Sequence, residues 1–169
     1  MRDGRHYSHY IIISIIFAAV YLLQSGVGLL PGIFAVRPLP LLALVTAIAM
    51  FESKGAAFAF GLCGGLLMDV LTPRISCFNT VFLTVAAVSV ALLIELLFNN
   101  APLSAAVLGG IVCGAYYLVY WLIYLLSGGD ALMMLLRYCL PGAVYSWAFT
   151  LPFYFLMRAL EKRERRIRV

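Results

Sequence analysis

The stretch that decides the fold covers residues 61–74, whose sequence is GLCGGLLMDVLTPR. It places glycines and an aspartate inside a segment that is otherwise mostly apolar. Four residues in this region are spaced four apart: Ala57, Gly61, Gly65 and Asp69. Since four residues advance an α-helix only about 40° beyond a full turn, all of them share one helix face. The small residues on that face allow a second helix backbone to approach closely.

The composition around this stretch is that of a membrane protein. Hydrophobic residues make up 64% of the chain and charged residues 11%, with a mean hydropathy of +1.04. Soluble domains are typically about 25% charged. Because a membrane-spanning helix needs roughly 20 apolar residues, the chain has room for little besides spans. We therefore expect residues 1–169 to form a single integral membrane domain.

Six apolar segments predict an all-α, polytopic membrane protein with about six transmembrane helices. Their approximate ranges are 10–30, 38–52, 55–71, 78–98, 102–126 and 134–157. The connection at residues 52–55 is so short that the second and third segments are expected to form an antiparallel hairpin. Leucine-rich and alanine-rich runs of this length favour helices over the alternating strands of a membrane barrel.

Basic residues predict the orientation, because cytoplasmic loops carry an excess of lysine and arginine. If both termini are cytoplasmic, nine basic residues lie inside and three outside. The inside set is Arg2, Arg5, Lys54, Arg158, Lys162, Arg163, Arg165, Arg166 and Arg168; the outside set is Arg37, Arg74 and Arg137. This asymmetry favours a multi-pass membrane protein with an even number of spans and both ends in the cytoplasm.

Residues 159–169 form a basic tail that continues the last predicted helix into the cytoplasm. With Arg158, its basic side chains are expected to contact anionic lipid headgroups. Docking of a protein partner is the alternative use of this tail. The net charge of +5 is therefore attributed to membrane topology, and no nucleic acid partner is expected.

Sequence motifs for catalysis or metal binding are absent. The chain has no Walker A loop, no HExxH and no G-x-S-x-G elbow, and its four cysteines have no CxxC spacing. Apart from Glu52 in the connection between the second and third segments, Asp69 and Glu95 are the only acids within the predicted spans. They are expected on opposite sides of the membrane. His6 and His9 are expected to be solvated tail residues. The sequence thus predicts a protein that is not an enzyme and has no cofactor.

Asp69 needs a partner, because an isolated charge in the membrane costs several kcal/mol. Its position near a helix C-terminus makes the helix dipole unfavourable as well. The candidate partners are Arg74, the backbone amides of the following turn, and Asn79. Two roles remain open: a hydrogen bond that fixes the loop between the third and fourth helices, or contact with a ligand or partner.

The fifth predicted helix repeats the small-residue spacing at Ala106, Gly110 and Gly114. Both small-residue faces are candidates for internal helix packing or for contact with a partner helix. Pro141 and Pro152 predict kinks in the sixth helix.

Three stretches follow one another in a recognisable order. They are LLQSGVGLL, VRPLPLLALVTAIAMFESKGAAFAFGLCGGLLMDVLTPRISCFNTVFLTVAAV and LPGAVYSWAFTLPFYFLMRAL, followed by the basic tail. In this order and pattern the chain resembles the bacterial rod-shape-determining MreD family. In that family an R-P-type dipeptide opens the second span, and a G-x-x-x-G-x-x-x-D-type helix precedes a loop that re-enters the membrane. The matching positions here are Arg37-Pro38, Gly61, Gly65, Asp69 and Asn79.

The resemblance implies a non-enzymatic scaffold of the cell-elongation complex that synthesises peptidoglycan and controls rod shape. It implies an MreC-like single-span partner, together with a RodA-type glycosyltransferase, its transpeptidase and the MreB filament. The family fold is similar to the six-helix substrate-binding subunits of vitamin-importing energy-coupling-factor transporters. That similarity supplies the alternative, a small-molecule-binding membrane subunit of a transporter.

The two functions require different surfaces. A binding subunit needs an outward-facing pocket with polar lining, to which Arg37, Asp69, Arg74, Asp130 and Arg137 are the candidate contributors. A scaffold needs an exposed face of small or apolar residues that another transmembrane helix covers, and the glycine spacing favours it.

Overall fold

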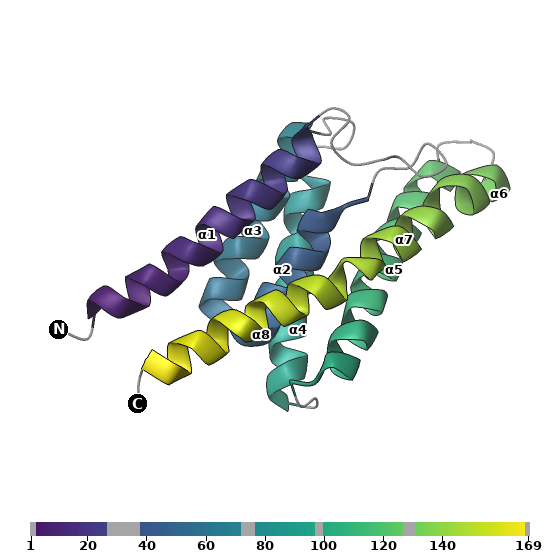
Figure 1. The fold of residues 1–169 in the computed structure, drawn as a ribbon. Helices are drawn as coiled ribbons and strands as arrows, with labels where there is room; N and C mark the ends of the chain where they lie inside the picture. Colours follow the sequence, from purple (N-terminus) through teal and green to yellow (C-terminus); the bar gives the residue numbers. More distant parts are fainter. Residues whose placement is uncertain (1–2, 27–37, 72–76, 97–99, 127–130, 168–169) are drawn as a thin grey trace.

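The computed structural model describes residues 3–26, 38–71, 77–96, 100–126 and 131–167, and of residues 3–8, 71, 131 and 164–167 it describes the backbone alone. The described residues are helical apart from short turns and contain no strand, so the chain is all-α (Figure 1). The helices are α1 (Asp3–Ser25), α2 (Pro40–Phe51), α3 (Lys54–Leu71), α4 (Phe78–Leu96), α5 (Pro102–Leu126), α6 (Ala131–Met134), the π-helix η1 (Leu135–Cys139), α7 (Leu140–Ala148) and α8 (Thr150–Ile167).

Each of the six apolar segments corresponds to helical structure. The first five match α1 to α5, and the sixth matches the consecutive elements α6, η1, α7 and α8. The predicted hairpin is also present, since only Glu52 and Ser53 separate α2 from α3 and the two helices pack together. α1 begins and α8 ends at the same end of the molecule (Figure 1).

Two prolines explain the interruptions in the last helical segment. Pro141 has no N–H to donate to the carbonyl of Arg137, and the preceding turn widens into η1, where the Leu140 N–H bonds to the Leu135 carbonyl. A second interruption lies at Phe149, three residues before Pro152. Both interruptions that the prolines predict are therefore present.

α2 is the centre of the bundle. Every residue from Pro40 to Met50 is buried, and α2 packs against α1, α3, α4, α5, α7 and α8. A helix that is hydrophobic on all sides is expected in such a position. α2 has 12 residues and is only about 18 Å long.

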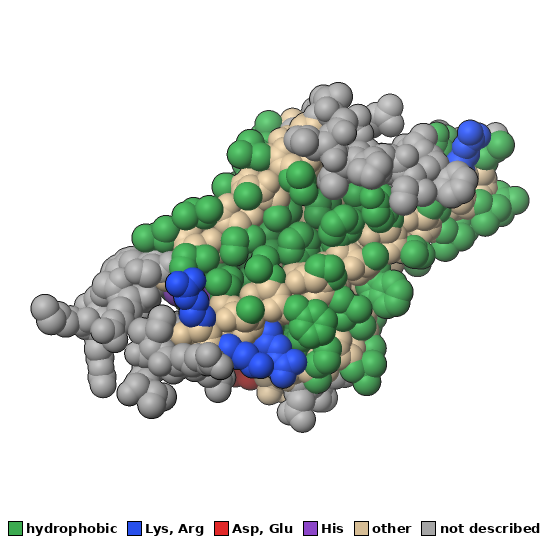
Figure 2. Space-filling view, in the orientation of Figure 1, with side chains coloured by type: hydrophobic (Ala, Val, Ile, Leu, Met, Phe, Trp, Pro, Cys, Tyr) green, Lys and Arg blue, Asp and Glu red, His purple; other side chains and the backbone are tan. Residues whose placement is uncertain are grey.

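The outer surface of the bundle is apolar. α4 and α5 are long and apolar enough to cross a membrane, and only 28% of the most apolar window in each is buried. Large side chains on their outer faces are well exposed: Val81 62%, Val85 60%, Leu103 76%, Ile111 59% and Leu118 59%. Figure 2 shows hydrophobic side chains spread over the described part of the face drawn there. A core helix of a soluble protein would be mostly covered, whereas these two helices are mostly uncovered.

Candidate functional site

The Asp69 carboxylate lies where α3 ends and α4 begins, and it accepts four hydrogen bonds. Its Oδ1 accepts from the backbone N–H and the side-chain Nδ2 of Asn79, both at 3.0 Å. Its Oδ2 accepts from the Thr80 backbone N–H at 2.9 Å and from the Thr80 hydroxyl. A carboxylate offers about four acceptor positions, so this one is fully used.

These bonds cap α4 with a side chain from another helix. The first amides of a helix have no partner within the helix, and Asn79 and Thr80 are the second and third residues of α4. The helix dipole favours an anion at this end, which offsets the unfavourable position of Asp69 near the C-terminus of α3. The expected bond to Asn79 is present, and the backbone amides that Asp69 accepts from belong to the first turn of α4. Thr80 was not foreseen, and Arg74 lies outside the described residues.

The backbone immediately before α4 is strained. Cys77 has a φ of 62°, a left-handed conformation that non-glycine residues adopt rarely. Such strain costs about 1–3 kcal/mol and persists only where the surroundings fix the conformation. The four bonds to Asp69 supply that constraint, because they hold the first turn of α4 against α3.

The glycine face of α3 packs against α4 within the same chain. A Cβ on Gly65 would overlap Thr80 Cα and lie 2.7 Å from the Asn79 carbonyl oxygen. A Cβ on Gly61 would lie 2.9 Å from the Leu83 carbonyl oxygen. With Ala57 only 1% exposed, this face is covered by the chain itself and brings Asp69 within reach of α4.

The hydrogen-bonded group extends to α5 through Tyr116. Its hydroxyl donates to Asn79 Oδ1 at 2.8 Å, and its ring contacts those of Phe78 and Phe82 at centroid distances of 5.7 and 5.3 Å. We refer to Asp69, Asn79, Thr80 and Tyr116 as the Asp69 network. It joins α3, α4 and α5 at the end of the bundle opposite the chain termini.

The N-terminus of α2 is capped by other helices in the same way. The Leu41 N–H donates to Gln24 Oε1 of α1 at 3.1 Å, and the Leu39 N–H donates to Ser146 Oγ of α7 at 3.0 Å. Tyr117 of α5 shares a hydrogen bond with Ser146 Oγ at 3.2 Å. Leu39 occupies the N-cap position and has no side chain able to cap, so distant polar side chains supply the acceptors.

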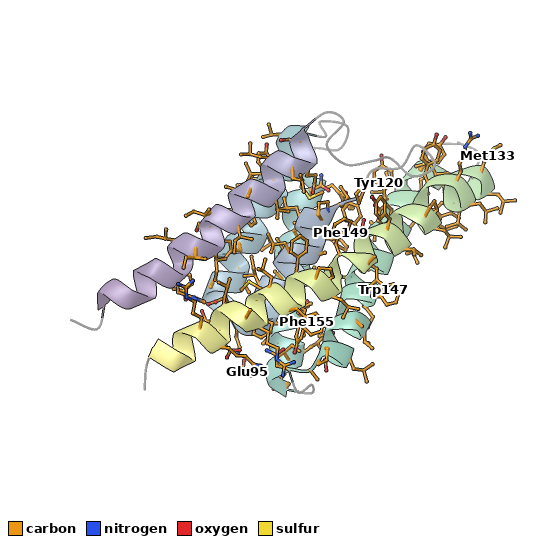
Figure 3. The ribbon with its side chains drawn as sticks, in the orientation of Figure 1. Glu95, Tyr120, Met133, Trp147, Phe149 and Phe155 are labelled. Carbon is orange, nitrogen blue, oxygen red and sulfur yellow. The ribbon has the colours of Figure 1, made fainter. Side chains whose placement is uncertain are left out.

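The predicted small-residue face of α5 is only partly packed. The Ala106 carbonyl accepts a hydrogen bond from Trp147 Nε1 at 2.7 Å, and Trp147 projects from α7 (Figure 3). A Cβ on Gly110 would lie 3.3 Å from the same Nε1 atom. Gly114 is exposed, and a Cβ there would meet nothing within 4 Å.

The closest approaches involving α5 use other residues. A Cβ on Gly109 would lie 2.6 Å from Thr150 Oγ1 of α8, and a Cβ on Gly142 of α7 would lie 2.7 Å from the Tyr117 ring. The face of α5 predicted from the spacing of Ala106, Gly110 and Gly114 is therefore adjacent to the face that makes the tightest contact, which is the one at Gly109. Since Gly109 and Gly110 are adjacent, small-residue spacing alone does not decide which one meets a neighbour.

Charged side chains gather at the end where α3 begins and α4 ends. Lys54 and Glu95 form an exposed ion pair at 2.7 Å. His9 contacts Glu52 at 2.6 Å, with side chains only 15% and 9% exposed. The expectation of a solvated His9 was therefore wrong, because α1 places this residue against the turn between α2 and α3.

The basic tail is described in part. Arg158 is half-buried on α8, and Lys162 and Arg163 are exposed. Arg165 and Arg166 belong to α8 by their backbone, and their side chains lie outside the described part. Arg37, Asp130 and Arg168 also lie outside it.

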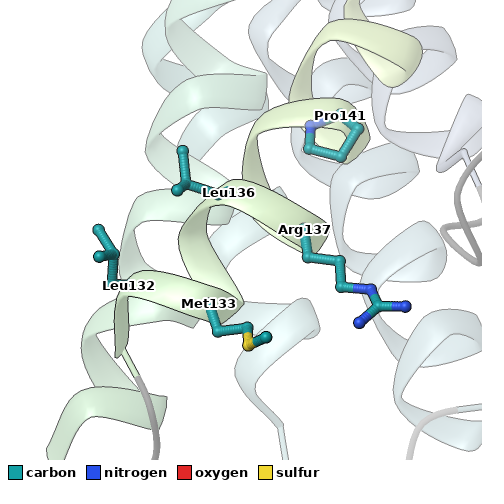
Figure 4. Close-up of a pocket in the computed structure, with 5 residues that line it drawn as sticks. All are labelled: Leu132, Met133, Leu136, Arg137 and Pro141. Atoms are coloured by element: carbon teal, nitrogen blue, oxygen red, sulfur yellow. The ribbon is translucent and has the colours of Figure 1, made fainter.

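A groove lies at the other end of the molecule, on α6, η1 and α7 (Figure 4). It has a volume of about 590 Å³ and is lined by Leu132, Met133, Leu136, Arg137 and Pro141. Arg137 and Asp69, both candidates for a polar pocket, do not meet in it. Among the described residues no group of three or more histidine, cysteine, aspartate or glutamate side chains is placed to hold a metal ion.

No family model, curated protein or solved structure matches this chain. The chain is all-helical, and its described part contains two helices long and apolar enough to cross a membrane. Polar side chains such as Asp69, Ser146 and Tyr116 connect neighbouring helices within it.

Proposed function

We propose that the chain is a multi-pass protein of the bacterial inner membrane and a non-enzymatic scaffold of the MreD type in the cell-elongation complex. Its partners on this proposal are an MreC-like single-span protein, a RodA-type glycosyltransferase with its transpeptidase, and the MreB filament. The observation that carries the scaffold assignment is the saturation of Asp69, because all of its acceptor positions serve helix packing.

Membrane insertion with both termini in the cytoplasm is supported by the distribution of apolar and basic groups. The outer faces of α4 and α5 are apolar and uncovered. Lys54 and the basic residues of α8 lie toward the end that carries the chain termini, whereas Arg137 of η1 lies at the other end. This asymmetry agrees with the excess of basic residues on cytoplasmic sides of membrane proteins.

The transport alternative has less support from the described residues. A substrate-binding subunit needs polar groups that converge on a pocket and remain free to bind a ligand. Asp69 has no acceptor position left. The groove on α6, η1 and α7 is apolar apart from Arg137. The Asp69 carboxylate therefore holds helices together and is not free to bind a substrate, which favours a scaffold over a binding subunit.

The surface available for a partner helix is the face of α5 around Gly114. Gly61 and Gly65 are covered by α4, whereas a side chain at Gly114 would enter open space. Ile111 and Leu118 flank it, and each is 59% exposed. Close approach of a second transmembrane helix at a small residue is a common mode of association in membranes. We assign this face to the MreC-like partner.

The experiment is co-purification with an MreC-like protein from rod-shaped cells that depend on this chain. Gly114→Ile should leave the amount of inserted protein unchanged, lower recovery of the partner severalfold and make the cells round. Gly55→Ile is the matched control, because a side chain at Gly55 also meets open space but lies in the first turn of α3 and not on α5. Normal partner recovery and normal cell shape with Gly114→Ile would contradict the assignment, and a vitamin-like molecule bound at one per chain would favour the transporter.

A further inference from the structure

The groove on α6, η1 and α7 combines apolar side chains with one cation. Leu132, Met133, Leu136 and Pro141 supply the apolar lining, and Arg137 supplies the charge (Figure 4). Its volume of about 590 Å³ is within the range of small-molecule sites, roughly 300–1,000 Å³. The groove therefore suits a molecule with an apolar body and an anionic group.

The lining follows the direction of the helix. Met133, Arg137 and Pro141 are four residues apart, as are Leu132 and Leu136, so the groove has two neighbouring rows along one side. From residue 132 to residue 141 these rows extend along about 14 Å of helix. An extended chain fits such rows better than a compact ring.

Arg137 is exposed and has no ion-pair partner among the described residues. The described acidic side chains are engaged or distant: Glu52 contacts His9, Glu95 pairs with Lys54, and Asp69 bonds to α4. Glu161 lies on α8 toward the end that carries the chain termini. A guanidinium is always charged and forms two parallel hydrogen bonds with a phosphate. Nothing in the described part of the chain neutralises Arg137, so it can pair with an anionic ligand.

The depth of Arg137 is that of lipid headgroups, provided that the chain is inserted as proposed above. Tyr138 is next to Arg137 in η1 and is 42% exposed. Tyr124 is in the last turn of α5, a helix that packs against η1, and is 38% exposed. Exposed tyrosines mark the boundary between hydrocarbon and water in membrane proteins. Met133 lies at the end of the molecule opposite Glu95 (Figure 3), so this boundary is that of the outer leaflet.

We propose that the groove is a binding site for an anionic phospholipid of the outer leaflet. One acyl chain lies along the apolar side chains of the two rows, and the phosphate pairs with Arg137. The site rests on the membrane insertion in the proposed function, but it needs neither the MreC-like partner nor the scaffold role. It gives the last helical segment a fixed lipid contact where η1 interrupts the α-helix.

The test is native mass spectrometry of the full chain in mild detergent, with added phosphatidylglycerol or zwitterionic phosphatidylcholine. The unmodified protein should retain phosphatidylglycerol severalfold more than phosphatidylcholine. Arg137→Gln should abolish this preference, whereas Lys54→Gln, the matched control at the other end, should preserve it. Leu136→Gln keeps the cation and should reduce retention of both lipids. Size-exclusion elution and thermal unfolding of each variant establish that it is folded.

Three results would overturn the site. The first is equal retention of the two lipids by the unmodified protein, and the second is an unchanged preference in Arg137→Gln. The third is a dimer without bound lipid that Leu136→Gln dissociates, since the groove would then hold a second copy. Extraction of the chain from membranes by alkaline carbonate would refute insertion and with it both proposals. Resistance to carbonate together with any of the three results would refute the lipid site alone.

Discussion

The contact between Gly65 and α4 allows a quantitative test of the bundle. Replacing Gly65 by alanine adds a methyl group that would overlap Thr80 Cα and lie 2.7 Å from Thr80 N and Asn79 O. All three are backbone atoms in the first turn of α4, so rotation of a side chain cannot remove the overlap. Either α3 and α4 separate or α4 shifts along its axis.

The expected cost has two parts. Overpacking of a close contact costs about 1–3 kcal/mol. Separation of the helices also lengthens the bonds from Asn79 and Thr80 to Asp69, and hydrogen bonds to a charged group contribute about 1.5–3 kcal/mol each. We therefore expect Gly65→Ala to lower the free energy of unfolding by about 3 kcal/mol or more.

Two further glycines provide the comparison. At Gly114 the new methyl group meets nothing within 4 Å, and alanine is favoured over glycine in a helix by about 1 kcal/mol, so Gly114→Ala should raise stability. At Gly61 the nearest atoms lie 2.9–3.1 Å from the Cβ position, and the effect should be intermediate. The assay is reversible unfolding of the purified protein in mixed micelles. Equal effects at Gly65 and Gly114, or a change below about 0.5 kcal/mol at Gly65, would refute the close packing.

Two other substitutions test the same junction in the same unfolding assay. Asp69→Asn keeps one acceptor oxygen, whereas Asp69→Leu leaves the Asn79 and Thr80 donors unpaired, so leucine should cost at least about 2 kcal/mol more; equal losses would contradict the capping role. Cys77→Gly removes the left-handed strain at φ 62° and should raise stability by up to about 1 kcal/mol. A loss of stability in that variant would show that the Cys77 side chain contributes more than its backbone strain costs.

The helices were predictable from the sequence because the signal is local. Long apolar runs end at polar, glycine or proline residues, and the observed α2, α3 and α5 agree with the predicted ranges within two residues at each end. The bond between Asp69 and Asn79 also followed from local considerations, since a charge at that depth needs a nearby donor. Thr80 is the next residue, and a helix beginning at Phe78 would have identified its amide as a further donor.

Contacts between distant parts of the chain were not predictable in this way. His9 and Glu52 are 43 residues apart, and Leu39 and Ser146 are 107 apart. Each pair meets only because of how the helices are arranged around α2. The choice between Gly109 and Gly110 has the same origin, because a rotation of α5 by one residue would exchange their environments.

The shortness of α2 explains why its cap comes from other helices. A helix of 12 residues covers about 18 Å, well short of a hydrocarbon core about 30 Å thick. If the bundle is inserted as proposed, the first amides of α2 lie where water is scarce, and unpaired backbone groups there cost several kcal/mol each. Gln24 and Ser146 remove that cost for Leu41 and Leu39.

Asp69 caps α4 in the same way, because it accepts hydrogen bonds from the backbone amides of Asn79 and Thr80 at the start of that helix. In both places polar side chains are used to complete the backbone hydrogen bonding of a neighbouring helix. Using them internally leaves the outer surface of α4 and α5 apolar. A bundle built in this way meets its surroundings through shape, through apolar contact and through the few cations at its two ends. Those are the means by which a scaffold binds another helix and a lipid headgroup.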